Sequence, residues 1–192
     1  MRLFSLLMDR VLIWSRHPKA TFYLAGLSFA ESSFFPIPPD VMLAPMVIAS
    51  PKKAWRFAAI TTISSVLGGL AGFFIGMFAI DLIEPSLKQF GYWDVYLLAK
   101  DWFSSWGFWA ILAAGFSPIP YKIFTIAAGA ITMPLMPFIV ASIFGRASRF
   151  FLVAGLIYLG GKKFEDRLRQ YIDLIGWLFV AAMVLGFLIL GN

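Results

Sequence analysis

Apolar stretches separated by short polar segments cover most of the chain, and two of these stretches are interrupted by prolines. Residues 57–80, 135–160 and 174–190 are continuous apolar stretches, whereas 20–50 and 107–134 are each broken near the middle. A helix that crosses the hydrocarbon core needs roughly 20 apolar residues, with a range of about 17–25. The continuous stretches therefore predict about three transmembrane helices.

The prolines predict that each broken stretch forms a re-entrant helical hairpin. The first break contains Pro36, Pro38 and Pro39, and the second contains Pro118 and Pro120. A helix does not continue through such a cluster, because proline lacks the backbone donor and clashes with the preceding turn. Half-helices of about 10–16 residues reach about 15–24 Å, which is short of the roughly 30 Å hydrocarbon core. Paired broken segments of this kind point to a transporter binding site.

The first residues of the chain predict an amphipathic helix that lies at the membrane surface. Apolar side chains recur on one helical face of residues 1–19, at Leu3, Leu7, Val11 and Trp14. Such a pattern is typical of an interfacial helix. The sequence thus predicts an all-α integral membrane protein with a single domain, 1–192, in which 20–160 form the core and 174–190 a C-terminal transmembrane helix.

Basic residues gather in segments that lie on one side of a membrane if both hairpins re-enter. Residues 1–19 and 51–56 together hold seven Lys and Arg, and 161–173 hold four, whereas 81–106 hold two together with four acidic residues. Cytoplasmic loops of membrane proteins are enriched in Lys and Arg. The pattern predicts a multi-pass protein of the bacterial inner membrane with a cytoplasmic N-terminus, an acidic outer loop, and two oppositely oriented hairpins.

The composition excludes several classes of protein. Of the 192 residues, 60% are apolar and 14% are charged, whereas a soluble domain carries about 25% charged residues. A soluble globule of this size cannot bury so much apolar surface. The net charge of +6 fits basic cytoplasmic segments, so no nucleic-acid partner is expected. With no cysteine and one histidine, His17, we expect neither a metal site nor a cofactor.

Ionisable residues at or near membrane depth are the candidate functional residues, because an unpaired charge is costly there. They are Glu31, Asp40, Lys122, Arg146 and Arg149. We expect the two acids to couple to protons or to gate transport, and the three bases to bind an anionic substrate such as a phosphate. Structural alternatives stay open: Asp40 suits the first turn of a helix, Lys122 can extend to the interface, and the acids can pair with the arginines.

A glycine occurs every four residues in the first continuous stretch, at Gly68, Gly72 and Gly76. Small residues at this spacing let a second helix approach closely. We expect this face to pack against another helix, either within the chain or in a homo-oligomer.

The motifs around these charges resemble those of the DedA family, also called the VTT-domain or SNARE-associated Golgi protein family, and are similar to its YqaA-like bacterial branch. The resemblance covers about residues 20–160. It rests on Glu31, the runs 36–40, 116–122 and 145–150, Ala128-Gly129 and Met133. It implies opposed re-entrant hairpins and transport or scrambling of lipids, with polyprenyl phosphates as substrates of bacterial relatives. Glu31 and Asp40 match the family's acidic pair, while Lys122 and Gly115 stand where many members carry arginine.

The sequence as a whole favours a flippase or scramblase that moves an anionic lipid head group, either a polyprenyl phosphate or a phospholipid. Membrane lipids are the expected partners, and proton coupling is compatible with this function. Two alternatives stay open: a proton-coupled transporter of a small solute or ion, and a membrane-assembly factor that transports nothing. An enzyme is not expected, because histidine-based phosphatase chemistry needs both a nucleophile and an acid, and His17 is the only histidine.

Overall fold

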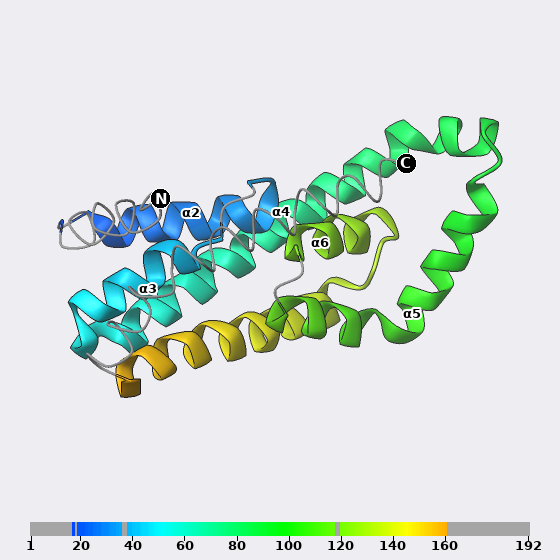
Figure 1. Ribbon diagram of the computed structural model, residues 1–192. Coiled ribbons are helices and arrows are strands. Elements are labelled where there is room, and N and C mark those ends of the chain that lie inside the picture. Colours follow the sequence, from blue (N-terminus) through cyan, green and yellow to red (C-terminus); the bar gives the residue numbers. More distant parts are fainter. Residues whose placement is uncertain (1–16, 18, 36–37, 118–119, 161–192) are drawn as a thin grey trace, which may run out of the picture.

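The computed structural model describes residues 17, 19–35, 38–117 and 120–160, except for the side chain of Val95. This part of the chain is built from helices joined by short turns (Figure 1). In chain order the elements are α2 (Ala20–Ser33), α3 (Asp40–Ala49), the short 3-10 helix η1 (Pro51–Lys53), α4 (Ala54–Gln89), α5 (Trp93–Phe116), α6 (Tyr121–Ala130) and a final described helix, Leu135–Gly160. The prediction of an all-helical protein is therefore confirmed.

Two of the described helices are long and apolar enough to cross a membrane. They are Pro51–Gln89, which joins η1 to α4, and Leu135–Gly160, and they contain two of the predicted transmembrane stretches. Large apolar side chains on the outside of the helices are widely exposed, for example Phe22, Leu82 and Leu159, at 78%, 81% and 82%. Lipid accommodates such surfaces, whereas in water they are a liability.

Two further predictions concern the ends of the chain. The expected amphipathic helix covers residues 1–19, and the expected third transmembrane helix covers 174–190. Both lie outside the described residues, apart from His17 and Lys19, and both stay predictions.

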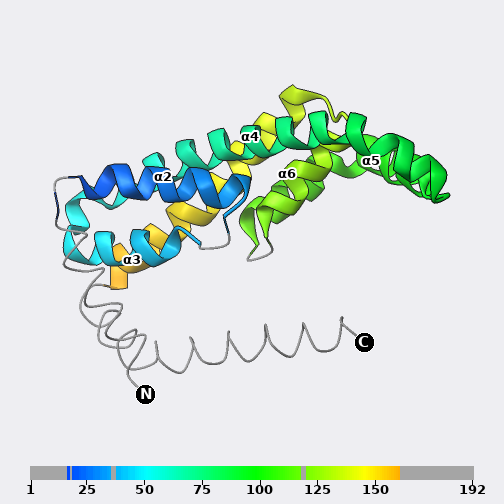
Figure 2. The ribbon, with the colours of Figure 1, turned by 90° about the horizontal axis from the view of Figure 1, so that it is seen from above.

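Both proline clusters end one helix before the next begins, as the sequence predicts. α2 ends at Ser33 and α3 begins at Asp40, while α5 ends at Phe116 and α6 begins at Tyr121. Figure 2 shows α2 and α3 running in opposite directions. α2 has 14 residues, and α3 and α6 have 10 each, so their lengths of about 21 Å and 15 Å fall short of a bilayer core. The expected length is wrong for α5, which has 24 residues and reaches about 36 Å because it continues back through the segment of mixed composition before residue 107.

Most of the predicted acidic loop at residues 81–106 is helical, so the loop conformation is wrong, while the position of this segment on the outer side stays a prediction. α4 continues to Gln89, and α5 begins at Trp93 after a turn in which Gly91 has a φ of +76°. Lys88 Nζ pairs with Glu84 at 2.6 Å, one helical turn apart, and also lies 4.6 Å from the ring centroid of Trp93. Such pairs stabilise an exposed helix. The charged residues that suggested a loop therefore lie in two helices that continue beyond their apolar segments.

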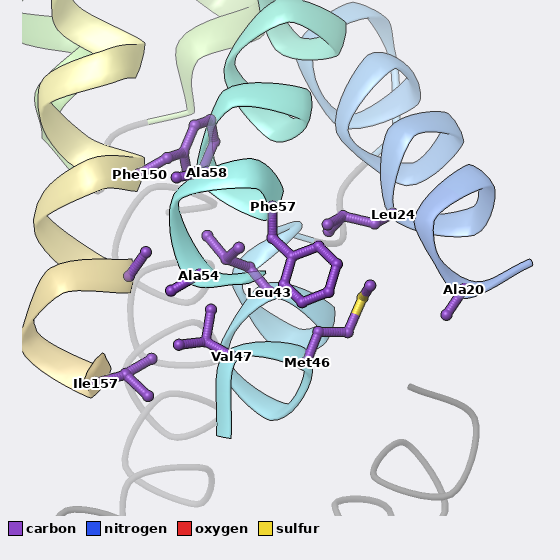
Figure 3. Packing of buried hydrophobic residues seen from close by; sticks show 11 residues of the cluster. Ala20, Leu24, Leu43, Met46, Val47, Ala54, Phe57, Ala58, Phe150 and Ile157 are labelled. Atoms are coloured by element: carbon purple, nitrogen blue, oxygen red, sulfur yellow. The ribbon is translucent and has the colours of Figure 1, made fainter. Parts of the chain in front are cut away.

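Two clusters of buried apolar side chains hold the described helices together. The first joins α2, α3, α4 and the Leu135–Gly160 helix (Figure 3) and includes Leu24, Leu43, Met46, Phe57 and Phe150. The second joins α4, α5, α6 and the same final helix and includes Phe73, Ile111, Tyr121 and Phe138. Each hairpin therefore has its own apolar core, and α4 and the final helix run through both.

α4 packs against both hairpins because glycines leave room where the backbones meet. A Cβ atom at Gly68 would overlap the carbonyl of Phe29 in α2, and one at Gly76 would overlap the carbonyl of Ile126 in α6. On the opposite side, a Cβ at Gly129 of α6 would overlap the backbone of α4. The glycine ladder thus packs helices of the same chain, with α2 and α6 lying one after the other along α4 (Figure 1).

Candidate functional site

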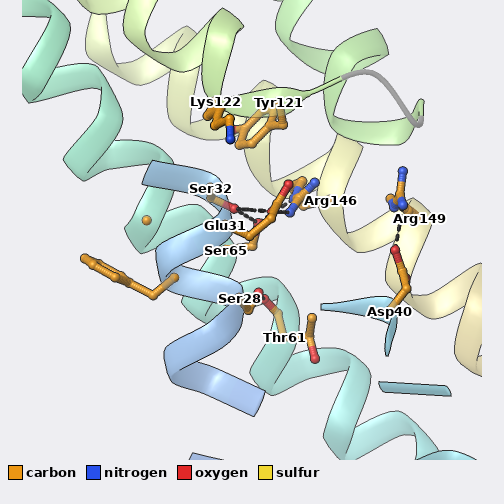
Figure 4. Close-up of polar contacts among 12 residues, drawn as sticks. Ser28, Glu31, Ser32, Asp40, Thr61, Ser65, Tyr121, Lys122, Arg146 and Arg149 are labelled. Atoms are coloured by element: carbon orange, nitrogen blue, oxygen red, sulfur yellow. Dashed lines mark hydrogen bonds and ion pairs between the residues drawn. The ribbon is translucent and has the colours of Figure 1, made fainter. Parts of the chain in front are cut away.

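The two helix breaks meet between the two apolar clusters, and the predicted functional residues lie at this meeting point (Figure 4). Lys122, at the start of α6, donates a hydrogen bond from Nζ to the carbonyl of Phe35 in the first break, at 3.2 Å. Thr125 Oγ1 donates to the carbonyl of Ser32 at 3.5 Å. The structure therefore brings together two segments that are more than 80 positions apart in the sequence.

Glu31 pairs with Arg146 in the more deeply buried of the two ion pairs at this junction. Arg146 Nη2 lies 2.5 Å from Glu31 Oε2, and the exposed fractions of the two side chains are 3% and 14%. Arg146 Nη2 also donates to Ser32 Oγ at 3.1 Å, and Arg146 Nε donates to Ser65 Oγ. Arg146 is thus bonded to one charged group and two hydroxyl groups.

The guanidinium group of Arg146 also lies over two aromatic rings, one from each apolar cluster. Its Cζ atom is 4.8 Å from the ring centroid of Tyr121 and 4.7 Å from that of Phe150. A guanidinium over an aromatic face gains electrostatic attraction, most of all where water is excluded. Tyr121 is itself held by a 2.5 Å hydrogen bond from its hydroxyl to Ser142 Oγ.

Asp40 pairs with Arg149, and this second pair links the two helix breaks. Arg149 Nη2 lies 2.6 Å from Asp40 Oδ2, and Arg149 Nη1 donates to the carbonyl of Ser117 in the second break at 2.7 Å. Their side chains are 21% and 25% exposed. Within the described part of the chain, Asp40 Oδ1 and Arg149 Nε are buried and have no hydrogen-bond partner.

The geometry also bears on the alternatives left open for single residues. Asp40 is in the first turn of α3, where a carboxylate interacts favourably with the helix dipole, and it pairs with Arg149 as well. Lys122 reaches the first hairpin instead of pointing away from the protein. Both arginines pair with acids, so the site holds two positive and two negative charges in contact, with Lys122 as an additional cation.

The pattern of the sequence did not identify several hydroxyl-bearing residues of the site. Ser32 and Ser65 bond to each other at 2.7 Å and both bond to Arg146, and Ser28 Oγ donates to the carbonyl of Thr61 at 2.7 Å. A usable signal was their spacing, because Ser28 and Ser32, like Thr61 and Ser65, lie four residues apart inside apolar stretches. That spacing places each pair on one helical face.

Among the residues that the structure describes, no three His, Asp or Glu side chains come together as a metal site requires. The paired acids and guanidinium groups are suited to exchanging one anionic partner for another, because a phosphate can replace a carboxylate as the acceptor of the same charge-assisted hydrogen bonds.

Comparisons with known proteins place the chain among relatives of the same length. The sequence model of the VTT domain matches residues 37–159. An uncharacterized protein of Haemophilus influenzae is 45% identical over 192 residues, which cover 100% of both chains. An uncharacterized protein of Histophilus somni is 45% identical over 190 residues, which cover 99% of this chain and 100% of the relative. No solved structure matches the chain significantly.

Proposed function

Because the chain belongs to the VTT-domain or DedA family of membrane proteins, we propose that it moves an anionic lipid head group across the bacterial inner membrane, as a flippase or scramblase. The proposal rests on one observation: the ion pairs Glu31–Arg146 and Asp40–Arg149 lie side by side where the two helix breaks meet. Charges inside a membrane protein are costly and are kept where they serve transport.

In the proposed topology, the α2–α3 and α5–α6 hairpins enter the bilayer from opposite faces, and the N-terminus is cytoplasmic. The short lengths of α2, α3 and α6 support re-entry. Backbone that leaves a helix at membrane depth must be covered by protein or line a wet cavity, and at the described edges of the breaks the carbonyls of Phe35 and Ser117 accept hydrogen bonds from Lys122 and Arg149. A site between opposed repeats lies near the middle of the membrane.

In the proposed mechanism, the phosphate of the head group replaces Asp40 as the acceptor on Arg149. Arg149 Nε is buried and has no partner in the described residues, so a phosphate oxygen can use this donor as well as Nη2 once the junction opens. Lys122, which donates to a single backbone carbonyl, supplies further positive charge. The acyl or prenyl chain stays in the lipid while the head group crosses. Glu31 and Asp40 couple the cycle to protons: Asp40 can take up a proton when Arg149 moves to the phosphate, and Glu31 can exchange one while Arg146 stays beside it.

Lipid exchange in liposomes tests this function. The purified protein is reconstituted with a fluorescent phosphatidylglycerol or a fluorescent isoprenoid phosphate, and a membrane-impermeant quencher reports how fast inner-leaflet label reaches the outside, with and without a pH gradient. We expect Arg149→Gln to slow exchange at least about tenfold, because charge-assisted hydrogen bonds worth about 1.5–3 kcal/mol are lost. Arg56→Gln is the matched control, since Arg56 is exposed at the start of α4.

The outcomes separate the lipid function from its alternatives. Exchange of both labels at the rate of protein-free liposomes contradicts a flippase or scramblase. Proton movement driven by a soluble anion or cation, without lipid exchange, points to a transporter of small solutes. Normal cellular function of a folded Glu31→Gln variant favours an assembly factor, because such a factor needs no proton-carrying acid.

A further inference from the structure

Arg146 and Arg149 lie on one helix and each pairs with an acid, but their surroundings differ. The Arg146 side chain is 3% exposed and its acid, Glu31, is 14% exposed. The Arg149 side chain is 21% exposed and its acid, Asp40, is 25% exposed. An ion pair that is less buried costs less to separate, since solvent or a ligand replaces the lost contact more readily.

The polar contacts of Arg146 use two of its three donor groups and reach three partners, whereas no hydrogen bond of its Nη1 atom is described. Its Nε and Nη2 atoms donate to Ser65, Glu31 and Ser32. Ser32 Oγ also bonds to Glu31 Oε2 at 3.0 Å, so one hydroxyl holds both members of the ion pair. The guanidinium plane is further covered by the rings of Tyr121 and Phe150. Moving Arg146 to a phosphate would break all of these contacts at once.

Arg149 has fewer contacts than Arg146, and its ion pair is more exposed. Its three donor groups have two described partners, Asp40 and the carbonyl of Ser117, while its Nε has none. Asp40 Oδ1 also has no partner in the described residues. A buried polar atom without a partner is unfavourable, and a phosphate monoester could supply the missing acceptor to Arg149.

We propose that the two arginines have different roles, and that Ser65 and Tyr121 are the positioning residues that separate them. Ser65 and the ring of Tyr121 hold Arg146 as a permanent countercharge to Glu31, so Arg146 does not contact the substrate. Arg149 exchanges Asp40 for the oxygen atoms of a phosphate monoester. The identity of that phosphate as a lipid head group rests on the proposed function, whereas the division between the arginines rests on the contacts alone.

Chemical modification of arginine tests the division directly. The full-length protein in detergent is treated with phenylglyoxal, and the modification of each arginine is followed over time by mass spectrometry. We expect Arg146 to react at least about tenfold more slowly than Arg149, because its reaction requires several charge-assisted hydrogen bonds to open. Arg56, which is exposed, reports the rate of an unprotected arginine.

Variants of the positioning residues extend the test. Ser65→Ala and Tyr121→Leu should raise the rate at Arg146 and leave the rate at Arg149 unchanged. Ser65→Thr keeps the hydroxyl group and should restore protection, and Tyr121→Phe keeps the ring. A merely structural defect would speed the reaction at both arginines and would not be rescued by threonine. The comparison of Arg146 with Arg149 in the unaltered protein needs no variant to fold.

Protection by ligands completes the test. Farnesyl phosphate should slow the reaction at Arg149 and not at Arg146, and farnesol, which lacks the phosphate, should protect neither. Equal reaction rates at the two arginines, or protection of Arg146 by farnesyl phosphate, overturn the division. Protection of Arg149 alone by inorganic phosphate at the same concentration agrees with different roles for the two arginines but contradicts a lipid substrate. The proposed roles of the arginines and the proposed lipid function can therefore fail separately.

Discussion

At the scale of single residues, the partners of each charge depend on contacts across most of the chain. Glu31 and Arg146 are 115 positions apart, and Asp40 and Arg149 are 109 apart. The sequence sufficed to predict that these four charges need partners, because unpaired charges are costly at membrane depth. It could not predict which acid meets which arginine, nor that Ser65 and Tyr121 complete the surroundings of Arg146, since both follow from how the hairpins pack.

The two acids should differ in how much they stabilise the fold. Glu31→Gln leaves Arg146 buried without a countercharge, and breaking such a pair costs about 3–5 kcal/mol. Asp40→Asn affects a pair in which both side chains are partly exposed, and we expect a loss of about 1–2 kcal/mol. Unfolding in mixed micelles with increasing SDS measures both values. A larger loss for Asp40→Asn would contradict the assignment of Glu31 and Arg146 as the fixed pair.

At the scale of secondary structure, features set by neighbouring residues were predictable. Three prolines in four positions end a helix whatever surrounds them, and both breaks occur where the sequence places them. The pattern of apolar residues did not predict how far α4 and α5 extend on either side of the turn at Gly91. There, the ion pair of Glu84 with Lys88 and the contact of Lys88 with Trp93 support helices in a segment of mixed composition.

The glycine positions on α4 give a prediction about helix packing. In Gly76→Ala the new methyl group overlaps the backbone of α6, so the helices must separate. We expect a loss of about 2–4 kcal/mol in the free energy of unfolding, as for other overpacked cores. Gly26→Ala in α2 is the matched control, because nothing lies within 4 Å of its Cβ. There, alanine should stabilise the helix by about 0.5–1 kcal/mol. Equal effects at the two sites would contradict the packing.

The C-terminal end of α6 offers a stabilising substitution. Met133 N donates to the carbonyl of Ala128, and Thr132 N donates to that of Gly129, which forms a Schellman motif with Thr132 at the left-handed position, φ +56°. Glycine is favoured there and a β-branched residue is strained. Thr132→Gly should raise the free energy of unfolding by about 0.5–1 kcal/mol. The same SDS titration measures it, and a loss of stability would contradict the motif.

At the scale of the whole molecule, two apolar cores meet across a polar junction. Lys122 and Thr125 of α6 donate to the carbonyls of Phe35 and Ser32 in the first hairpin. Arg149 of the final helix joins Asp40 to the carbonyl of Ser117 in the second break. Each hairpin has its own apolar core, and α4 and the final helix run through both. In the proposed transport cycle, the hairpins separate at the junction while each keeps the contacts within its own core.

The crossing of α5 with the final helix fixes one boundary of this junction. A Cβ atom at Gly115 would lie 3.2 Å from the backbone of Gly145, so the two helices are in close contact there. A larger side chain at 115 therefore requires a wider crossing of the two helices.

The proposed transport route between the hairpins is tested most directly by linking the two helix breaks chemically while lipid exchange is measured. The chain has no cysteine, so Phe35→Cys with Lys122→Cys can be linked by a short, reducible bis-methanethiosulfonate reagent in reconstituted liposomes, with the single-cysteine variants as controls. We predict that the unlinked double variant exchanges head-group-labelled lipid more slowly than the unaltered protein, because the charge of Lys122 is lost. The link should stop the remaining exchange, and reduction should restore it. Undiminished exchange by fully linked protein would contradict a transport route between the hairpins.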